Sequence, residues 1–195
     1  MNIKIVKTAF KIMDATLNND GSIQFNYLEV IKDEKKQILP PTFLKANYAR
    51  VYLIVVNGII KKIGGSEDKG GIKGTLAIYR DGGIKGRPSI RSYGIFKLIQ
   101  VELQKGHKVE FFMIYQEDIE SRIKGLFGLK DKQLMRISYK YLEDSCKLDY
   151  KQHENGKLPE WNFQEQGMDW PDLIKKLHTE ITTDSLTRPK AKGRK

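Results

Sequence analysis

Residues 50–64 read RVYLIVVNGIIKKIG, the most informative stretch of this chain. Two short apolar runs flank Asn57-Gly58, the dipeptide that most strongly favours a tight turn between antiparallel strands. The stretch therefore predicts a β-hairpin with an apolar face that can meet a core. Tyr52 and Lys62 are the side chains on its other face that can take part in chemistry.

Two registers of this hairpin are open. A two-residue loop on Asn57-Gly58 pairs Tyr52 with Ile63 and leaves Lys62 on the opposite face. A three-residue loop, with Gly58 in the left-handed conformation as a bulge, pairs Tyr52 with Lys62 instead. The choice matters because a slip of one residue moves every side chain to the other face. We favour the three-residue loop, because only it gathers the two reactive side chains. Its apolar face then consists of Val51, Leu53, Val55, Ile59 and Ile63.

Length and composition predict a soluble single domain with appended segments. The chain has 195 residues, of which 39% are hydrophobic, and its mean hydropathy is −0.50. The longest apolar run, residues 51–56, is too short to cross a bilayer, and the N-terminus lacks the pattern of a signal peptide. Cys146 is the single cysteine, which excludes an intrachain disulfide. A reducing cytoplasm is the expected location.

The charge favours a polyanionic partner. Thirty-five Lys and Arg residues against 24 Asp and Glu give a formal net charge of +11, and the pI is near 9.5. Residues 188–195 hold five of these cations, so the rest of the chain still carries about +6. The sequence therefore predicts a basic body that binds nucleic acid and a basic tail on its phosphates.

Composition shifts divide the chain into four segments. Residues 1–48 are an N-terminal extension with a strand expected over 22–31, and Pro40-Pro41 breaks the chain before the hairpin. Residues 49–163 form the core. Residues 164–183 contain a C-terminal helix, and residues 184–195 are a basic, flexible tail.

The stretch that follows the hairpin, residues 64–88, is rich in glycine and interleaved with cations. Its composition disfavours a long helix, although residues 75–80 can form one or two turns. Backbone that a ligand can approach closely, set among cations, is typical of phosphate contact. The cations of this region and of the next helix that we predict to contact DNA are Lys69, Arg80, Lys85, Arg87 and Arg91.

Periodicity and capping residues predict the remaining elements of the core. Residues 89–105 form an apolar-faced helix that ends at Lys105-Gly106. Residues 109–115 read as a buried strand, and residues 131–146 as a second helix. A further amphipathic helix is expected over 169–181, with Pro171 in its first turn.

The order hairpin, helix, strand, helix resembles the GIY-YIG nuclease family. Val51-Tyr52 lies ten residues before Lys62-Ile-Gly64, and the resemblance covers residues 50–163. Residues 103–112 (LQKGHKVEFF) resemble the passage from helix to third strand in restriction and phage members. Glu143, followed by Pro-Glu-Trp-Asn at 159–162, stands where the family carries its metal-binding glutamate. The resemblance implies a mixed α+β fold, a small three-stranded antiparallel sheet flanked by helices.

The chain departs from the family pattern at three places. Arg50-Val51 replaces Gly-Ile in the first motif. Lys62 replaces the tyrosine of the second motif, as in some restriction endonucleases of the family. The family's arginine has no clean counterpart: Lys73 stands at the expected distance, and Arg80 and Arg87 are the nearest arginines.

The resemblance assigns a coherent set of roles to four residues. Tyr52 is the general base, and Lys62 opposite it stabilises the phenolate, because a neighbouring cation favours the charged form. Lys73 supplies the cation for the phosphate. Glu143 binds a single Mg²⁺ or Mn²⁺, and one carboxylate with waters and a phosphate oxygen suits Mg²⁺.

The predicted function is that of a type II restriction enzyme, which hydrolyses double-stranded DNA. Cutting both strands at a short site needs two active sites, so we expect a homodimer, and a restriction enzyme implies a cognate DNA methyltransferase. Two alternatives stay open. One is a DNA-binding protein without catalysis. The other is a nuclease of the PD-(D/E)XK type, whose loose pattern fits Asp20 and Glu34-Lys35-Lys36.

Overall fold

The computed structural model describes residues 1–84 and 86–187. Lys85, a predicted DNA contact, and the cations of residues 188–195 lie outside the described residues. Among the helices that are described, none is both long and apolar enough to cross a membrane.

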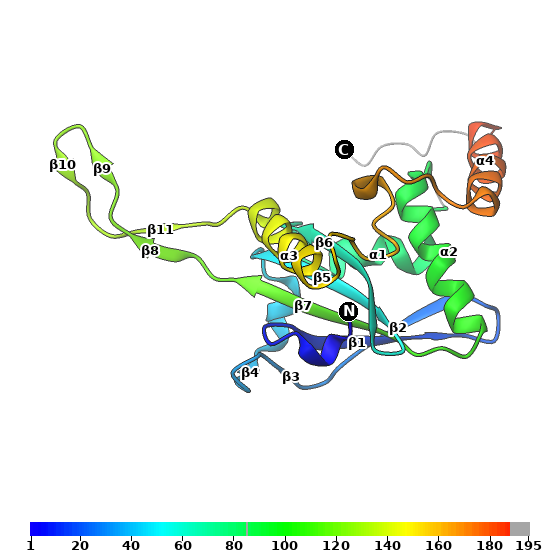
Figure 1. Cartoon of the computed structure of the whole chain (residues 1–195), viewed down its shortest axis with the longest axis horizontal. Coiled ribbons are helices and arrows are strands. Elements are labelled where there is room, and N and C mark those ends of the chain that lie inside the picture. Colours follow the sequence, from blue (N-terminus) through cyan, green and yellow to red (C-terminus); the bar gives the residue numbers. More distant parts are fainter. Residues whose placement is uncertain (85, 188–195) are drawn as a thin grey trace.

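A five-stranded antiparallel sheet forms the centre of the fold (Figure 1). In spatial order its strands are β2 (Ile23–Tyr27), β1 (Phe10–Leu17), β7 (Val109–Gln116), β5 (Ala49–Val56) and β6 (Ile59–Ser66). The expected mixed α+β class is confirmed, but the expected count of three strands is wrong. The strand predicted over 109–115 is confirmed as β7.

The two additional strands come from the N-terminal segment: β1 pairs with β7, and β2 pairs with β1. β1 buries Phe10, Ile12, Met13 and Ala15, and its register with β7 shifts between Lys11 and Met13. Two consecutive buried residues at this bulge break the alternation by which a strand is found in a sequence. This irregularity concealed the strand.

The turn of the β5–β6 hairpin is the two-residue loop Asn57-Gly58, so the favoured three-residue loop is wrong. Both residues have positive φ, 47° and 80° respectively, as the tightest hairpin turns require. Val56 pairs with Ile59 directly beside it. The pairing then shifts by one residue, because Lys61 is inserted as a bulge.

This bulge places the reactive residues differently from either expected register. Tyr52 pairs with Gly64, and Lys62 pairs with Ile54. The predicted Tyr52–Lys62 pair is therefore wrong. Because Tyr52 pairs with a residue two positions farther along β6 than predicted, the side chains of Tyr52 and Lys62 still lie on the same face of the sheet.

The apolar face of the hairpin is largely as expected. Val51, Leu53, Val55 and Ile63 are buried together on it. Ile60 takes the expected place of Ile59, since Ile60 is 2% exposed and Ile59 is 40% exposed.

Helices cover both faces of the sheet (Figure 1). α1 (Gly71–Asp81) and α2 (Ile90–Gln104) pack on the face that carries Tyr52 and Ile54, through residues such as Leu76 and Ile99. On the opposite face, α3 (Tyr139–His153) and the 3-10 turn η1 (Ile3–Ile5) cover the apolar side of the hairpin.

Two helices lie close to their predicted positions. α2 matches the helix predicted over 89–105, and the Ser89 hydroxyl caps it by accepting a bond from the Ser92 N–H. α4 (Asp172–Thr187) corresponds to the helix predicted over 169–181, which ended too early. α1 is longer than the one or two turns expected in its glycine-rich segment, because Ile72, Leu76 and Tyr79 bury one side of it.

The helix predicted over 131–146 is wrong at its start. α3 begins after Ser138, whose side chain accepts a bond from the Lys140 N–H. The residues before it form an arm in which β8 (Ile119–Ser121) pairs with β11 (Gln133–Met135), and β9 (Lys124–Gly125) with β10 (Gly128–Leu129).

The arm projects from the body of the molecule (Figure 1). Leu126 and Phe127, at its tip, are 97% and 104% exposed. Helix periodicity in its sequence was misleading, since its apolar residues meet no core. The remaining short elements are β3 (Ile31–Lys32), β4 (Ile38–Leu39), η2 (Pro41–Lys45) and η3 (Gln164–Gln166).

Candidate active site

The Tyr52 side chain lies across the end of β6 and against α1. A Cβ atom on Gly64 would stand 2.4 Å from both Cζ and the hydroxyl oxygen of Tyr52, so only glycine leaves room for the ring. The Tyr52 hydroxyl is 2.7 Å from the hydroxyl of Tyr79. Tyr79 comes from α1, and sequence reasoning did not identify it.

Lys62 is buried on the same face of the sheet, with 1% of its surface exposed. Among the described residues, no carboxylate lies within ion-pairing distance of its ammonium. Burial lowers the pKa of Lys62 to about 8; Arg91 and Lys147 lower it as well, and Glu165 and Glu143 oppose them. A buried lysine without a paired carboxylate is costly, and such groups gather at functional sites.

Tyr52 holds its proton firmly in the free protein. Burial raises its pKa well above the ordinary value for tyrosine, and the neighbouring Tyr79 raises it further. Arg91 is the cation that lowers it. The sequence predicted that Lys62 would stabilise the Tyr52 phenolate, and this role stays a prediction; the sequence did not connect Arg91 with Tyr52.

Arg91 enters the site from the first turn of α2. Its Nη2 atom lies 3.5 Å from Oε1 of Glu165. Burial lowers the pKa of Arg91, but Tyr52, Tyr79, Glu165 and Glu143 together raise it above the ordinary value. The guanidinium is therefore a permanent positive charge close to both tyrosines.

Glu143 approaches β6 from the opposite side, on α3. It is 8% exposed, and a Cβ atom on Gly65 would stand 2.6 Å from its Oε2 atom. Its Oε1 atom forms an ion pair of 2.7 Å with Lys147, without the alignment of a hydrogen bond. Because Gly64 and Gly65 have no side chains, only bare backbone separates Tyr52 from Glu143.

The donor set suits a divalent cation held by one carboxylate. No group of three or more His, Cys, Asp or Glu side chains is placed to hold a metal in the part of the chain that the structure describes. Mg²⁺ is commonly bound by one or two carboxylates, with substrate phosphates and waters as the other ligands. Glu143 fits this pattern, and a cation there would compete with Lys147 for the carboxylate.

Asn162 fixes the strand that carries Lys62. Its side chain is fully buried, accepts a bond of 2.9 Å from the Ile63 N–H, and donates one of 2.8 Å to the Ile63 carbonyl. The Trp161 N–H donates to the Lys61 carbonyl at 2.8 Å. Residues 159–162 thus cover the edge of β6, where backbone groups would otherwise have no partner. The sequence indicated this segment only as part of a motif.

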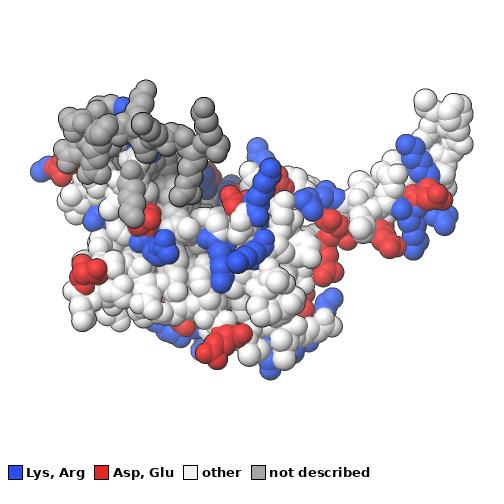
Figure 2. Space-filling model, turned by 180° about the vertical axis from the view of Figure 1, so that it is seen from behind, with Lys and Arg blue, Asp and Glu red and all other residues white. Residues whose placement is uncertain are grey.

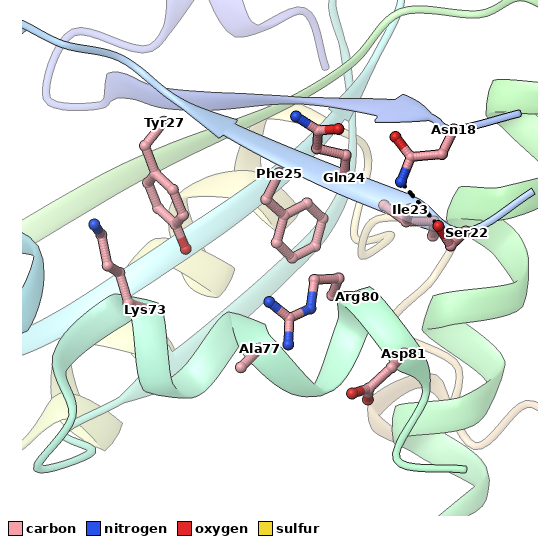
Figure 3. A pocket seen from close by; sticks show the side chains of 10 residues that line it. All are labelled: Asn18, Ser22, Ile23, Gln24, Phe25, Tyr27, Lys73, Ala77, Arg80 and Asp81. Carbon is pink, nitrogen blue, oxygen red and sulfur yellow. Dashed lines mark hydrogen bonds between the residues drawn. The ribbon is translucent and has the colours of Figure 1, made fainter. Parts of the chain in front are cut away.

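The other predicted catalytic residue, Lys73, lies elsewhere. Its Nζ atom is 4.6 Å from the centre of the Tyr27 ring. Lys73 and Arg80 line a pocket between α1 and β2 (Figure 3). They occupy a side of α1 different from that of Tyr79, which is in contact with Tyr52.

The remaining predicted DNA contacts are solvent-exposed. Lys69 precedes α1, and Arg87 precedes α2. Figure 2 shows Lys and Arg side chains gathered near the centre of the rear face of the body, while the arm carries both signs of charge.

The residues of the PD-(D/E)XK alternative form two separate turns. Asp20 accepts bonds from the Ser22 N–H and hydroxyl in the turn between β1 and β2. Glu34 and Lys36 lie exposed in the turn between β3 and β4, where Lys36 has a φ of 66°. Asp20 therefore serves local turn geometry, and Glu34 and Lys36 belong to a different turn.

Comparison with known proteins establishes the fold. No protein-family model matches the sequence, and no curated protein matches it. A mutant of EndoII from bacteriophage T4 is similar in structure, with a TM-score of 0.50 and 21% identity, over 83% of this chain and 98% of that chain. The restriction endonuclease HPY188I in complex with product DNA gives a TM-score of 0.43 and 18% identity, over 82% and 84%. The chain therefore shares the fold of the phage protein.

Proposed function

We propose that this protein is a metal-dependent endonuclease of the GIY-YIG type that cuts double-stranded DNA, as a type II restriction enzyme does. The observation that carries the proposal is the convergence of Tyr52, Lys62, Arg91 and Glu143 on the side-chain-free end of β6. The fold shared with a phage endonuclease and the net charge of +11 support it.

Tyr52 is the proposed general base. Its hydroxyl is held by Tyr79 and must lose its proton for the base to act on a water molecule. Arg91 favours the phenolate, because it is the cation that lowers the pKa of Tyr52. Lys62 assists: a DNA phosphate nearby would raise its lowered pKa and keep its ammonium charged beside the reacting group.

Glu143 is the proposed ligand of Mg²⁺ or Mn²⁺, which when bound neutralises charge on the attacked phosphate and on the leaving oxygen. Lys147 holds the carboxylate in place in the free protein. Glu165 accepts the second contact of Lys147 at 3.5 Å, so the lysine keeps a partner when Glu143 is engaged elsewhere.

Cleavage of both strands requires two such sites, so the proposed active species is a homodimer on a symmetric DNA sequence. Lys69, Arg80 and Arg87 are proposed contacts to the phosphate backbone. The restriction activity would be matched by a methyltransferase of the same specificity.

Ranking two cation variants tests the proposed site. We transfer the phosphate-stabilising role from Lys73 to Arg91, because Arg91 lowers the pKa of Tyr52 and the Nζ atom of Lys73 lies over the Tyr27 ring. Arg91→Ala should reduce the cleavage rate about 10²- to 10³-fold, the usual cost of removing one such donor, and Lys73→Ala much less. Single-turnover cleavage of long unmethylated DNA measures both. The reverse ranking would return the role to Lys73.

A double variant separates this proposal from the PD-(D/E)XK alternative. Asp20→Ala with Glu34→Ala should cut DNA at the wild-type rate, since both residues lie in exposed turns. Loss of cleavage in this variant would favour that alternative.

Lys62→Met should lower the rate of DNA cleavage and raise the stability of the fold. The pKa of Lys62 falls from 10.5 in the unfolded chain to about 8 in the fold, so below pH 8 its buried charge costs on the order of 3 kcal/mol. Methionine removes that cost, and the variant should be more stable at pH 7 and cut DNA slowly. The difference should shrink between pH 8 and 10.5, where the folded lysine is neutral and the unfolded one still charged. Urea denaturation across this range measures it; an equal difference at all pH values would disprove the cause.

A further inference from the structure

A pocket lies between β2 and α1, apart from the Tyr52 cluster, which consists of Tyr52, Lys62, Arg91 and Glu143. This pocket has a volume of about 500 Å³, within the range of roughly 300–1,000 Å³ that is usual for small-molecule sites. Lys73, Ala77 and Arg80 line it from one face of α1, because residues separated by four and seven positions share a face of a helix. Phe25 and Tyr27 line it from β2.

Two cations and one carboxylate line this pocket, so its net charge is positive. Among the described residues, neither Lys73 nor Arg80 forms an ion pair. The one carboxylate that lines the pocket, Asp81, accepts a bond of 2.9 Å from the Gly83 N–H through Oδ1. Two cations without a carboxylate partner favour an anion between them.

Aromatic groups complete the lining. The ammonium of Lys73 lies over the Tyr27 ring, and Figure 3 shows the Tyr27 hydroxyl directed to the space between Lys73 and Arg80. Burial raises the pKa of Tyr27 to about 12, and Arg80 opposes the shift, so this hydroxyl stays protonated and can donate a bond to an anion. The Phe25 ring packs edge-on against Phe111 at 5.2 Å and lines the pocket as well.

We infer that this pocket binds a nucleotide unit, with its phosphate between Lys73, Tyr27 and Arg80 and its base against Phe25. Aromatic rings bind bases of any sequence by stacking. Tyr79 lies on the side of α1 that faces the Tyr52 cluster, and Lys73 lies on the side that faces this pocket. Because a helix is only ~10 Å across, the pocket is close to the Tyr52 cluster. The inference rests on the proposed function in that the nucleotide is expected to belong to the DNA strand being cut, displaced from its partner near the cleavage site.

Binding of deoxyadenosine 5′-monophosphate and of inorganic phosphate, each measured by calorimetry in EDTA, tests the pocket. The wild type should bind the nucleotide more tightly than phosphate. Lys73→Ala with Arg80→Ala should weaken binding of both at least tenfold, while Phe25→Leu should remove only the preference for the nucleotide. Lys4→Ala with Lys7→Ala removes the same charge from an exposed part of the chain and should change neither.

A single-stranded oligonucleotide identifies the source of the ligand. If the pocket holds part of a DNA strand, the oligonucleotide should displace the nucleotide from the wild type. If the oligonucleotide does not displace the bound nucleotide, the ligand is a free nucleotide, and this result would overturn the assignment to DNA.

Failure of this inference differs from failure of the proposed function. Equal binding by the wild type and the Lys73/Arg80 double variant, or no preference for nucleotide over phosphate, would disprove nucleotide binding in the pocket. Neither result would contradict the proposal that the protein cuts DNA. Nucleotide binding through the pocket by a protein that cuts no DNA would disprove the nuclease and leave the pocket standing.

Discussion

Replacing Tyr52 with phenylalanine should abolish strand cleavage while the protein stays folded. The change removes one hydroxyl, which is the proposed general base, and loss of a general base costs about 10²- to 10⁴-fold in rate. The Tyr79 hydroxyl loses its partner at 2.7 Å, so stability should fall by about 1–3 kcal/mol, the cost of an unpaired buried hydroxyl. Single-turnover cleavage and thermal unfolding measure the two effects.

Tyr79→Phe is the matched control. It breaks the same hydroxyl pair and carries a similar stability cost, but it leaves the proposed base in place. Its cleavage rate should therefore fall far less than that of Tyr52→Phe. Equal losses in the two variants would mean that the hydroxyl pair acts only in holding the site together, and Tyr52 would not be the base.

Glu143→Ala should separate DNA binding from DNA cleavage. The change removes the proposed metal ligand and a negative charge near the phosphate, so DNA binding should equal or exceed that of the wild type. Cleavage should be lost, because charge on the attacked phosphate and on the leaving oxygen is no longer neutralised. Filter binding and a cleavage assay on the same DNA measure both.

Asp144→Ala provides the comparison for Glu143→Ala. It removes the same charge from the next residue of α3, where the carboxylate is exposed rather than directed at Gly65. This variant should cut DNA at the wild-type rate. Cleavage by Glu143→Ala, or its loss in Asp144→Ala, would contradict the proposed metal site.

Local patterns in the sequence predicted much of the fold. The Asn57-Gly58 turn, the apolar face of the hairpin and the helix capped by Ser89 all depend on neighbouring residues, and all are present. The bulge at Lys61 has no such local signal. It adds one residue to β6, and the turn is one residue shorter than expected, so the two changes together replace the expected Tyr52–Lys62 pair with the pairing of Tyr52 and Gly64.

The candidate site was predicted in part, because its members come from distant segments. Tyr52, Lys62 and Glu143 were identified by their resemblance to known motifs, and the structure brings them to the same end of β6. Tyr79 and Asn162 were missed, since a hydroxyl contact between α1 and β5 and a side-chain bond across 99 residues leave no periodic trace.

Two cations show that the spacing of residues along the chain does not determine where their side chains point. Lys73 stands at the expected distance along the chain, yet the face of α1 that carries it is directed to Tyr27. Arg91 was predicted as a DNA contact, and the packing of α2 places its charge beside Tyr52. The direction of a side chain on a helix depends on which face the core buries, and this is a property of the whole fold.

One experiment tests directly whether this chain cuts DNA with a divalent metal, as we propose. Long unmethylated DNA is incubated with the wild-type protein in Mg²⁺ and, separately, in EDTA, and the products are separated by electrophoresis. We expect discrete fragments in Mg²⁺ and intact DNA in EDTA. DNA that is bound but stays intact in both Mg²⁺ and Mn²⁺ would contradict the claim and would indicate a DNA-binding protein without catalysis.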